Sequence, residues 1–371
     1  MINTAVKRLI SFKNKKLIKK LINIHIKHSI KSKKVIFLKN KRYKSMDLSV
    51  NYLGLELKNP IVVGSSGLTN SVEKIKELEQ YGAGAVVLKS LFEEQILFEE
   101  SNAGANNDYD YPEAMDYIKA YARDNSIEKY LQLIRDAKKE VSIPVIASIN
   151  CVDKGEWIAF AKKIENAGAD ALELNVSLLP SDINKTSKEN EQMYFDIVET
   201  IRKTIKIPLS LKMSHYSAGL TNLIQKLSWT KHIDGFTLFN RYYNPDIDID
   251  NLKITSSGVF STPEDISQSL RWVALLSGKI KTDIAASTGN HTGEDIIKQI
   301  LAGATVVHVV STLYKNGTKQ IKEMIETLDN WGNKHNYKSI EDFKGIVNFE
   351  SAENSVAFER VQFMKYFGGI E

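Results

Sequence analysis

Eight short apolar runs recur along the chain, and stretches with helical character separate them. Each run is nearly continuous in apolar and β-branched residues, which is typical of strands buried on both faces of a parallel sheet. A chain of this kind must cover both faces of its sheet with the intervening helices. The runs occupy residues 60–66, 85–90, 144–150, 171–177, 208–214, 235–240, 283–288 and 305–311.

The helical stretches end in a recurring way. Before three of the runs, a helix is expected to stop at Gly82, Gly168 or Gly303, and small residues lead into the next strand. Eight strand–helix units favour a (β/α)8 barrel over a doubly wound open sheet, because no G-x-G-x-x-G motif follows the first strand. The sequence therefore predicts the α/β class and a TIM (β/α)8 barrel.

Two connections are longer than the others, at 91–125 and 242–262. Both follow predicted strands, so we expect long loops at the C-terminal mouth of the barrel, where such loops shape active sites. Alternation in the second loop suggests a small hairpin. The segment 48–60, ahead of the first strand, is expected to form another hairpin that caps the barrel bottom.

Charge is distributed unevenly. Residues 1–46 hold 13 Lys and 2 Arg and no acid, which leaves 35 basic and all 45 acidic residues for 47–371. We therefore expect no nucleic-acid-binding patch on the body. We expect a disordered basic tail at 1–45 and a single barrel domain at 46–371 with a C-terminal helical extension. Two interpretations of the tail stay open: an anchor for anionic lipid or RNA, or a flexible tail in front of a working start at Met46.

Other classes of protein are excluded by composition. One cysteine, Cys151, permits neither a disulfide framework nor a zinc site with two thiolates, and no metal site is predicted. No uninterrupted apolar run reaches the ~18 residues that a membrane-spanning helix needs. We expect no transmembrane segment, and a cytoplasmic protein.

Polar side chains cluster where the predicted strands end. Lys89, Asn175, Lys212 and Asn240 each close an apolar run, and several hydroxyl residues stand beside them. Because the C-terminal ends of barrel strands meet at one mouth, these groups would face a polar, anionic ligand. A single strand-end lysine could instead reach out to water.

The last two predicted strands add a phosphate site. Thr288 and Gly289 follow the seventh strand, and Ser311 and Thr312 follow the eighth, each pair ahead of a helix. Loops after these two strands commonly hold phosphate in this fold through backbone N–H groups. Ordinary capping by Ser and Thr would explain each residue singly, but their joint position favours phosphate binding.

These residues lie in stretches that resemble the dihydroorotate dehydrogenases, most closely the soluble class 1 type. The resemblance runs from about residue 48 to 315, and its order and spacing are specific. The stretches are LGLELKNPIVVGSSG, AVVLKS, PVIASI, AKKIENAGADALELNVS, PLSLKMS, DGFTLFN and TGEDIIKQILAGATVVHVVSTLY.

The resemblance implies an FMN-dependent oxidation of dihydroorotate to orotate in pyrimidine biosynthesis. It implies that Lys212 faces the flavin N1/O2 region and stabilises the reduced ring. It places Asn175 and Asn240 on the substrate, with Lys89 between flavin and substrate. The residues that would contact FMN are Ser66, Lys89, Ser90, Ser148, Asn175, Lys212, Gly289 and Ser311.

One departure from the family concerns the catalytic base. The family removes a proton with Cys or Ser in an N-x-S-C/S-P-N motif, whereas here Leu178 holds that position. The candidates for a displaced base are Ser181, which we expect first, and Ser177 on the same loop. Cys151 and His215 are further candidates at the mouth.

Other departures from the family concern the substrate loop and the phosphate site. The family's N-x-x-G-L-x-N stretch has no counterpart, and residues 106–117 stand there instead. Thr288 stands in place of the first of two glycines that follow the seventh strand in the family. Val310 stands where the family's eighth strand usually ends in glycine. Alternatives therefore stay open: a related FMN enzyme with another cyclic substrate, a non-catalytic flavin protein, or a phosphate-binding aldolase or isomerase using Lys212 as a Schiff base.

The resemblance also bears on partners. Quinone-linked members carry an apolar helical segment ahead of the barrel, and the Lys-rich segment here does not match it. Fumarate, or an NAD-linked electron-transfer subunit, stays possible as the acceptor. A homodimer is expected.

Overall fold

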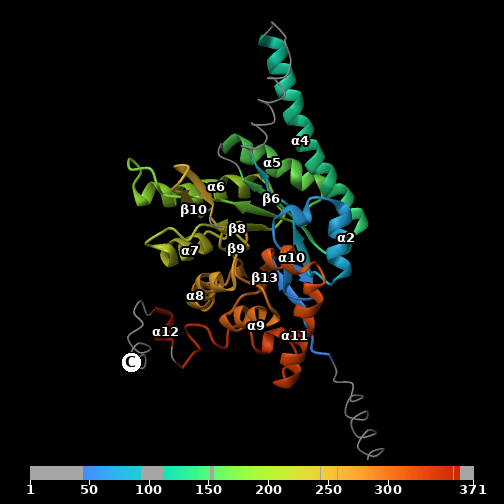
Figure 1. Cartoon of the computed structure of the whole chain (residues 1–371), viewed down its shortest axis with the longest axis vertical. Coiled ribbons are helices and arrows are strands. Elements are labelled where there is room, and N and C mark those ends of the chain that lie inside the picture. The colour runs from blue at the N-terminus through green and yellow to red at the C-terminus, as the bar shows by residue number, and fades with distance from the viewer. Residues whose placement is uncertain are drawn as a thin grey trace, which may run out of the picture. The chain divides into compact units, whose positions relative to one another are not determined.

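The computed structural model describes residues 45–92, 112–150, 154–242, 244–256, 258–353 and 355–359 (Figure 1). The chain divides into two compact units, Met1–Ser45 and Met46–Glu371, and the elements described belong to the second. The predicted basic tail, except Ser45, and Cys151 both lie outside the described residues.

Eight parallel strands close into a barrel, as the sequence predicts. β4 pairs with both β3 and β6, and the ring continues through β7, β8, β9, β12 and β13 back to β3. The two-residue strand β5 (Leu91–Phe92) adds to the upper end of β6. The barrel strands are β3 (Ile61–Val63), β4 (Ala85–Val87), β6 (Val145–Asn150), β7 (Ala171–Asn175), β8 (Leu209–Met213), β9 (Gly235–Leu238), β12 (Asp283–Ala286) and β13 (Val306–Val309).

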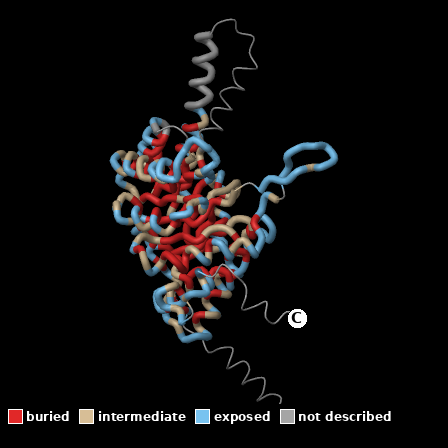
Figure 2. Tube along the Cα trace, turned by 90° about the vertical axis from the view of Figure 1, so that its left-hand side faces the viewer, coloured by how far each residue is buried: buried red, intermediate tan, exposed pale blue. Residues whose placement is uncertain are grey.

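Helices surround the barrel, and the buried residues gather at its centre (Figure 2). The helices turn one apolar face inward, as Ile75 and Leu78 do on the first of them. They are α2 (Val72–Gln80), α4 (Pro112–Glu140), α5 (Lys154–Ala167), α6 (Ser187–Thr204), α7 (Leu220–Trp229), α8 (Ile266–Leu276), α9 (Gly293–Ala302), α10 (Ser311–Asn316), α11 (Gln320–Lys334) and α12 (Val356–Glu359), with single 3₁₀ turns η1 (Gly67–Thr69), η2 (Pro263–Asp265) and η3 (Ile340–Asp342).

The predicted connection at 91–125 is wrong in its second half, because α4 begins at Pro112. A proline at the first position of a helix is well tolerated, since its missing N–H has no partner there in any case. The glycine-stopped turns are as predicted: Gly82, Gly168 and Gly303 have φ of +102°, +91° and +111°. These left-handed conformations favour glycine, so the three residues end their helices in the same way.

The barrel bottom is closed by the predicted hairpin of β1 (Val50–Tyr52) and β2 (Leu55–Leu57). The Tyr52 hydroxyl lies 3.4 Å from Ser210 Oγ inside the barrel. The backbone N–H of Leu53 donates to Asp283 Oδ2 at 2.8 Å. Since these contacts lie at the N-terminal ends of the strands, the opposite end is the open mouth.

The second predicted hairpin stands at the mouth and consists of β10 (Pro245–Asp248) and β11 (Lys253–Ser256). Its apolar face is formed by Ile247, Ile249, Leu252 and Ile254, which are 66%, 78%, 86% and 79% exposed. Ile247 lies directly opposite Ile254 in the antiparallel register. We call these four residues the hairpin face. No helix in the described part of the chain is long and apolar enough to cross a membrane.

Candidate active site

A cavity of about 460 Å³ opens at the C-terminal ends of the strands. Its size falls within the range of small-molecule and cofactor sites. The structure brings together nine side chains or backbone positions that the sequence singles out, and all of them line this cavity. They are Ser66, Lys89, Ser90, Asn175, Ser177, Lys212, Asn240, Gly289 and Ser311.

Three residues predicted at the site, Ser148, Ser181 and Thr312, do not line the cavity. Ser148 is fully buried behind Ser90, whose Oγ lies 2.8 Å from Ser148 Oγ. Ser90 in turn receives support from Ser65, whose Oγ accepts the Ser90 backbone N–H at 2.8 Å. Ser181 is exposed on the loop after β7 and does not line the cavity. Ser148 thus positions Ser90, and Ser181 lies farther from the cavity than Ser177.

The cavity is strongly cationic. Lys89, Lys212 and Arg241 line it, and no described lining residue is a carboxylate. The side-chain ammonium groups of Lys89 and Lys212 make no direct hydrogen bond or ion pair with any other described residue. Two ammonium groups in one cavity, neither in direct contact with a described carboxylate, favour an anionic ligand, because a negative charge would relieve their mutual repulsion.

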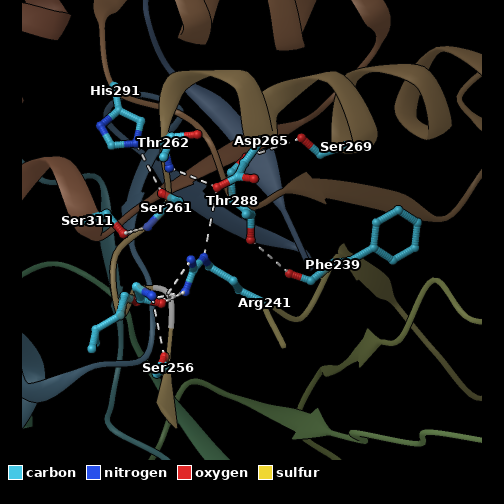
Figure 3. Close-up of polar contacts among 12 residues, drawn as sticks. Phe239, Arg241, Ser256, Ser261, Thr262, Asp265, Ser269, Thr288, His291 and Ser311 are labelled. Carbon is cyan, nitrogen blue, oxygen red and sulfur yellow. Dashed lines mark hydrogen bonds and ion pairs between the residues drawn. The ribbon is translucent and has the colours of Figure 1, made fainter. Parts of the chain in front are cut away.

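Arg241 follows Asn240 at a predicted strand end, where sequence analysis assigned it no role, and in the structure it shapes one wall of the cavity (Figure 3). Its guanidinium donates to the carbonyl oxygens of Gly258 and Val259 at 3.2 and 2.8 Å. Its Nε also lies 3.9 Å from Asp265 Oδ2. Arg241 therefore ties the end of β9 to the segment that returns from β11.

That returning segment also contacts the loops after the last two barrel strands. The backbone N–H of Ser261 donates to Ser311 Oγ at 3.0 Å, and Ser261 Oγ lies 3.1 Å from His291 Nε2 (Figure 3). Both loops were predicted from the sequence to hold phosphate. The contact between Ser261 and Ser311 could not be predicted from the sequence, because the two residues lie 50 positions apart and no motif links them.

Gly289 lies at a close approach of two backbones. A Cβ at this position would collide with the backbone nitrogen of Ile266, at the start of α8, and the φ of Gly289 is +82°. Thr288 precedes it with φ +76°, a conformation that is strained for a β-branched residue. The hydroxyl of Thr288 donates to the Phe239 carbonyl at 3.3 Å. Thr288 thus adopts a left-handed backbone conformation that favours glycine.

The substrate side of the cavity is a small amide and hydroxyl cluster. Ser177 Oγ donates to Asn175 Oδ1 at 3.3 Å and accepts from Asn240 Nδ2 at 3.1 Å. Leu178 is directed elsewhere: it packs against the core, and its carbonyl accepts from the Tyr242 hydroxyl at 3.0 Å. Among the loop residues 177–181, only Ser177 reaches the cavity.

His215 lines a smaller neighbouring cavity of about 90 Å³ together with Tyr216 and Tyr242. Its ring lies 4.1 Å from that of Tyr216, and its Nδ1 is buried with no partner in the described chain. Burial lowers the pKa of His215, so the ring is neutral near pH 7. The two cavities share Asn240 and Arg241, which places this candidate base beside the main cavity and not within it.

The floor of the cavity contains two polar groups that the sequence analysis passed over. His308 lines the cavity on β13, and burial together with nearby Lys212 lowers its pKa to about 3. Glu173 lies one layer deeper on β7 and accepts from Thr237 Oγ1 at 2.7 Å. The sequence signal that could have identified His308 and Glu173 is that each is a polar residue among the apolar residues of a predicted strand. No group of three metal-ligating side chains occurs among the described residues.

Comparison with known proteins gives a consistent answer. Residues 47–331 match the family described as dihydroorotate dehydrogenase. The chain is 27% identical over 310 residues to the catalytic subunit of dihydroorotate dehydrogenase B (NAD(+)) from Thermoplasma volcanium, covering 81% of this chain and 98% of that one. The corresponding subunit from Methanocaldococcus jannaschii is 25% identical over 309 residues, covering 81% and 98%. A relative from Aeropyrum pernix, named for a fumarate-linked enzyme, is 26% identical over 312 residues, covering 82% and 99%.

Proposed function

Because this chain belongs to the dihydroorotate dehydrogenase family, we propose that it binds FMN and oxidises dihydroorotate to orotate in pyrimidine biosynthesis. Enzymes of the family are oxidoreductases that act on a CH–CH bond, and this chain is one of them. The observation that carries the proposal is the cavity itself. Lys89, Lys212 and Arg241 line it without a described carboxylate, and it extends to Gly289 and Ser311.

FMN suits the two ends of this cavity. Its phosphate carries negative charge and would be held by backbone N–H groups around Gly289 and Ser311. At Gly289 the chain leaves no space for a Cβ. Its ring would lie toward Lys212, whose ammonium has no other partner in the described chain. When bound, FMN supplies the hydride acceptor. The protein supplies orientation and a fixed positive charge where negative charge develops.

The residues on the substrate side would position dihydroorotate. Asn175 and Asn240 can each exchange hydrogen bonds with a cyclic amide and carboxylate. Both already contact Ser177, so a substrate bound by the two amides would lie against the Ser177 hydroxyl. We propose Ser177 as the proton acceptor, with Ser181 as the alternative on the same loop.

A second candidate substrate is favoured by one observation. Leu178 holds the family's base position but packs against the core instead of facing the cavity. A different cyclic substrate, with a more acidic proton, would need a weaker base. Anaerobic reduction of the bound flavin by dihydroorotate, compared with a panel of other cyclic amides, distinguishes the two candidates.

Flavin binding can be tested at Gly289. We expect Gly289→Val to lower FMN affinity by about 5–150-fold, because the side chain would displace backbone from the phosphate end and overpacking commonly costs ~1–3 kcal/mol. Flavin content after purification and a titration of the apoprotein with FMN give the measurement.

The matched control is Gly258→Ala, at a glycine with open space around its Cβ position and no positive φ. This variant should bind FMN as the wild type does. Equal FMN affinity in wild type and Gly289→Val would show that the FMN phosphate is not held near Gly289. Wild-type protein that stays colourless after incubation with FMN would overturn the proposed function as a whole.

We further propose an electron-transfer partner and a homodimer. The Thermoplasma and Methanocaldococcus relatives are named as catalytic subunits, which supports a partner subunit for this chain too. The hairpin face supports self-association, because burying each of its isoleucines or its leucine would contribute about 1.5–3 kcal/mol. In a twofold dimer the same face would meet its own copy.

Self-association can be tested on the hairpin itself. We expect Ile254→Lys to convert a dimer to monomer at micromolar concentration, since it places a charge opposite Ile247 at the centre of the face. Thr255→Lys is the matched control, because it introduces the same charge on the other side of β11, opposite Asp246. Light scattering after gel filtration gives the mass. A dimer that survives Ile254→Lys would place the interface elsewhere.

A further inference from the structure

Glu173 is a buried carboxyl group in the middle of the barrel. Its side chain is 1% exposed, its Oε2 accepts from Thr237 Oγ1, and its Oε1 has no hydrogen-bond partner in the described chain. A carboxylate in such a place is costly unless a cation compensates it. Nothing in the proposed chemistry uses this residue directly, because it lies beneath the cavity and does not line it.

Lys212 is the cation within electrostatic reach. The register pairs Asn175 with Lys212 and Glu173 with Ser210, so Glu173 and Lys212 lie on adjacent strands in successive layers of the barrel interior. Burial is the larger influence on the pKa of Glu173 and raises it, and the positive charge of Lys212 opposes that rise. The ammonium has no other acidic neighbour in the described chain.

The remaining groups around Glu173 are neutral near pH 7. Tyr52 approaches from the bottom hairpin and Tyr130 from α4, and burial raises the pKa of both hydroxyls. His308, across the barrel, is held neutral by its lowered pKa of about 3. The ionisation of Glu173 therefore depends on burial, which favours the neutral acid, and on Lys212, which favours the carboxylate.

We propose that Glu173 is the buried counter-ion of Lys212 and thereby sets how much net positive charge the cavity floor presents to a bound flavin. This inference rests on the proposed binding of FMN. While Glu173 is ionised, it cancels part of the field of Lys212. Lys212 would lie beside the flavin, and Glu173 would act through it as a tuning residue.

The first consequence concerns the reduction potential. Reduction adds negative charge to the ring, so removing the negative counter-ion should favour the reduced form. Glu173→Gln keeps the acceptor for Thr237 and removes only the charge. We expect the equilibrium between reduced and oxidised flavin to shift at least tenfold toward reduced, which is about 30 mV upward for a two-electron couple.

A double-mutant cycle tests whether Glu173 acts through Lys212. Without the lysine, burial should leave Glu173 protonated, because no other described cation is close. Glu173→Gln should then change the potential less than twofold in a Lys212→Met background. Ser210→Ala, in the same layer and uncharged, is the matched control and should also stay within twofold of its parent.

Infrared spectroscopy of the apoprotein at pH 7 tests the pairing without any cofactor. Wild type should lack the carbonyl band of a buried protonated carboxylic acid. Lys212→Met should gain that band, and Lys212→Met/Glu173→Gln should lose it again. This readout holds even if FMN does not bind, so failure of the proposed function and failure of the counter-ion are separable.

Two results would overturn the inference. One is an infrared spectrum in which wild type and Lys212→Met agree, with the carboxylic-acid band either present in both or absent from both. That result would mean that the lysine does not control the proton on Glu173. The other is a flavin potential that Glu173→Gln leaves unchanged or moves downward.

Discussion

Replacement of Lys212 by alanine is expected to slow reduction of the bound flavin by dihydroorotate about 10²–10³-fold, the usual cost of losing one preorganised charge or donor. The reason is the position of this residue: Lys212 lies near the end of β8 and lines the cavity, and its ammonium group has no hydrogen-bond partner in the described chain that could divert it from the ligand. Stopped-flow absorbance under anaerobic conditions measures the rate.

Flavin content is the internal control for this variant. The phosphate end of the cavity lies around Gly289 and Ser311, so Lys212→Ala should still purify with flavin. Lys281→Ala, at an exposed lysine outside the cavity, should reduce at the wild-type rate. A Lys212→Ala rate within threefold of wild type would show that the cation is not used.

The other large effect is expected at Ser177. Ser177→Ala should lower the rate of substrate oxidation by about 10²-fold or more, the low end of general-base contributions. Ser177 Oγ is the hydroxyl of its loop that lines the cavity, and Asn175 and Asn240 fix its position. The rate of flavin reduction at saturating substrate is the measurement.

Ser181→Ala is the matched control on the same loop. Because Ser181 is exposed and outside the described cavity wall, its removal should change the rate less than threefold. A large loss in Ser181→Ala with none in Ser177→Ala would reverse the assignment. No loss in either would favour His215 or the different-substrate alternative.

The barrel could be predicted because its signals are local. Each strand is a nearly continuous apolar run, and residues such as Gly82 and Gly303 end helices by a conformation that side chains disfavour. The clustering of Lys89, Asn175 and Lys212 followed from topology alone, since all parallel strand ends share one mouth. The start of α4 was missed because its first residues carry loop-like composition.

The finer arrangement of the site could not be predicted because it depends on side-chain direction. Ser148 and Ser90 both lie toward the C-terminal ends of predicted strands, yet only Ser90 reaches the cavity, with Ser148 behind it. The Arg241 side chain is held by the carbonyl oxygens of Gly258 and Val259, and no motif or spacing in the sequence indicates this contact. A strand-end residue is placed at the mouth by the fold, but its neighbours decide what it contacts.

Anaerobic mixing of the purified protein with dihydroorotate is the most direct test of the central claim. The account predicts about one FMN per chain, with the yellow absorbance bleached by dihydroorotate and restored by an electron acceptor. Protein that binds FMN but keeps its full absorbance in excess dihydroorotate would contradict the claim that this chain is a dihydroorotate dehydrogenase.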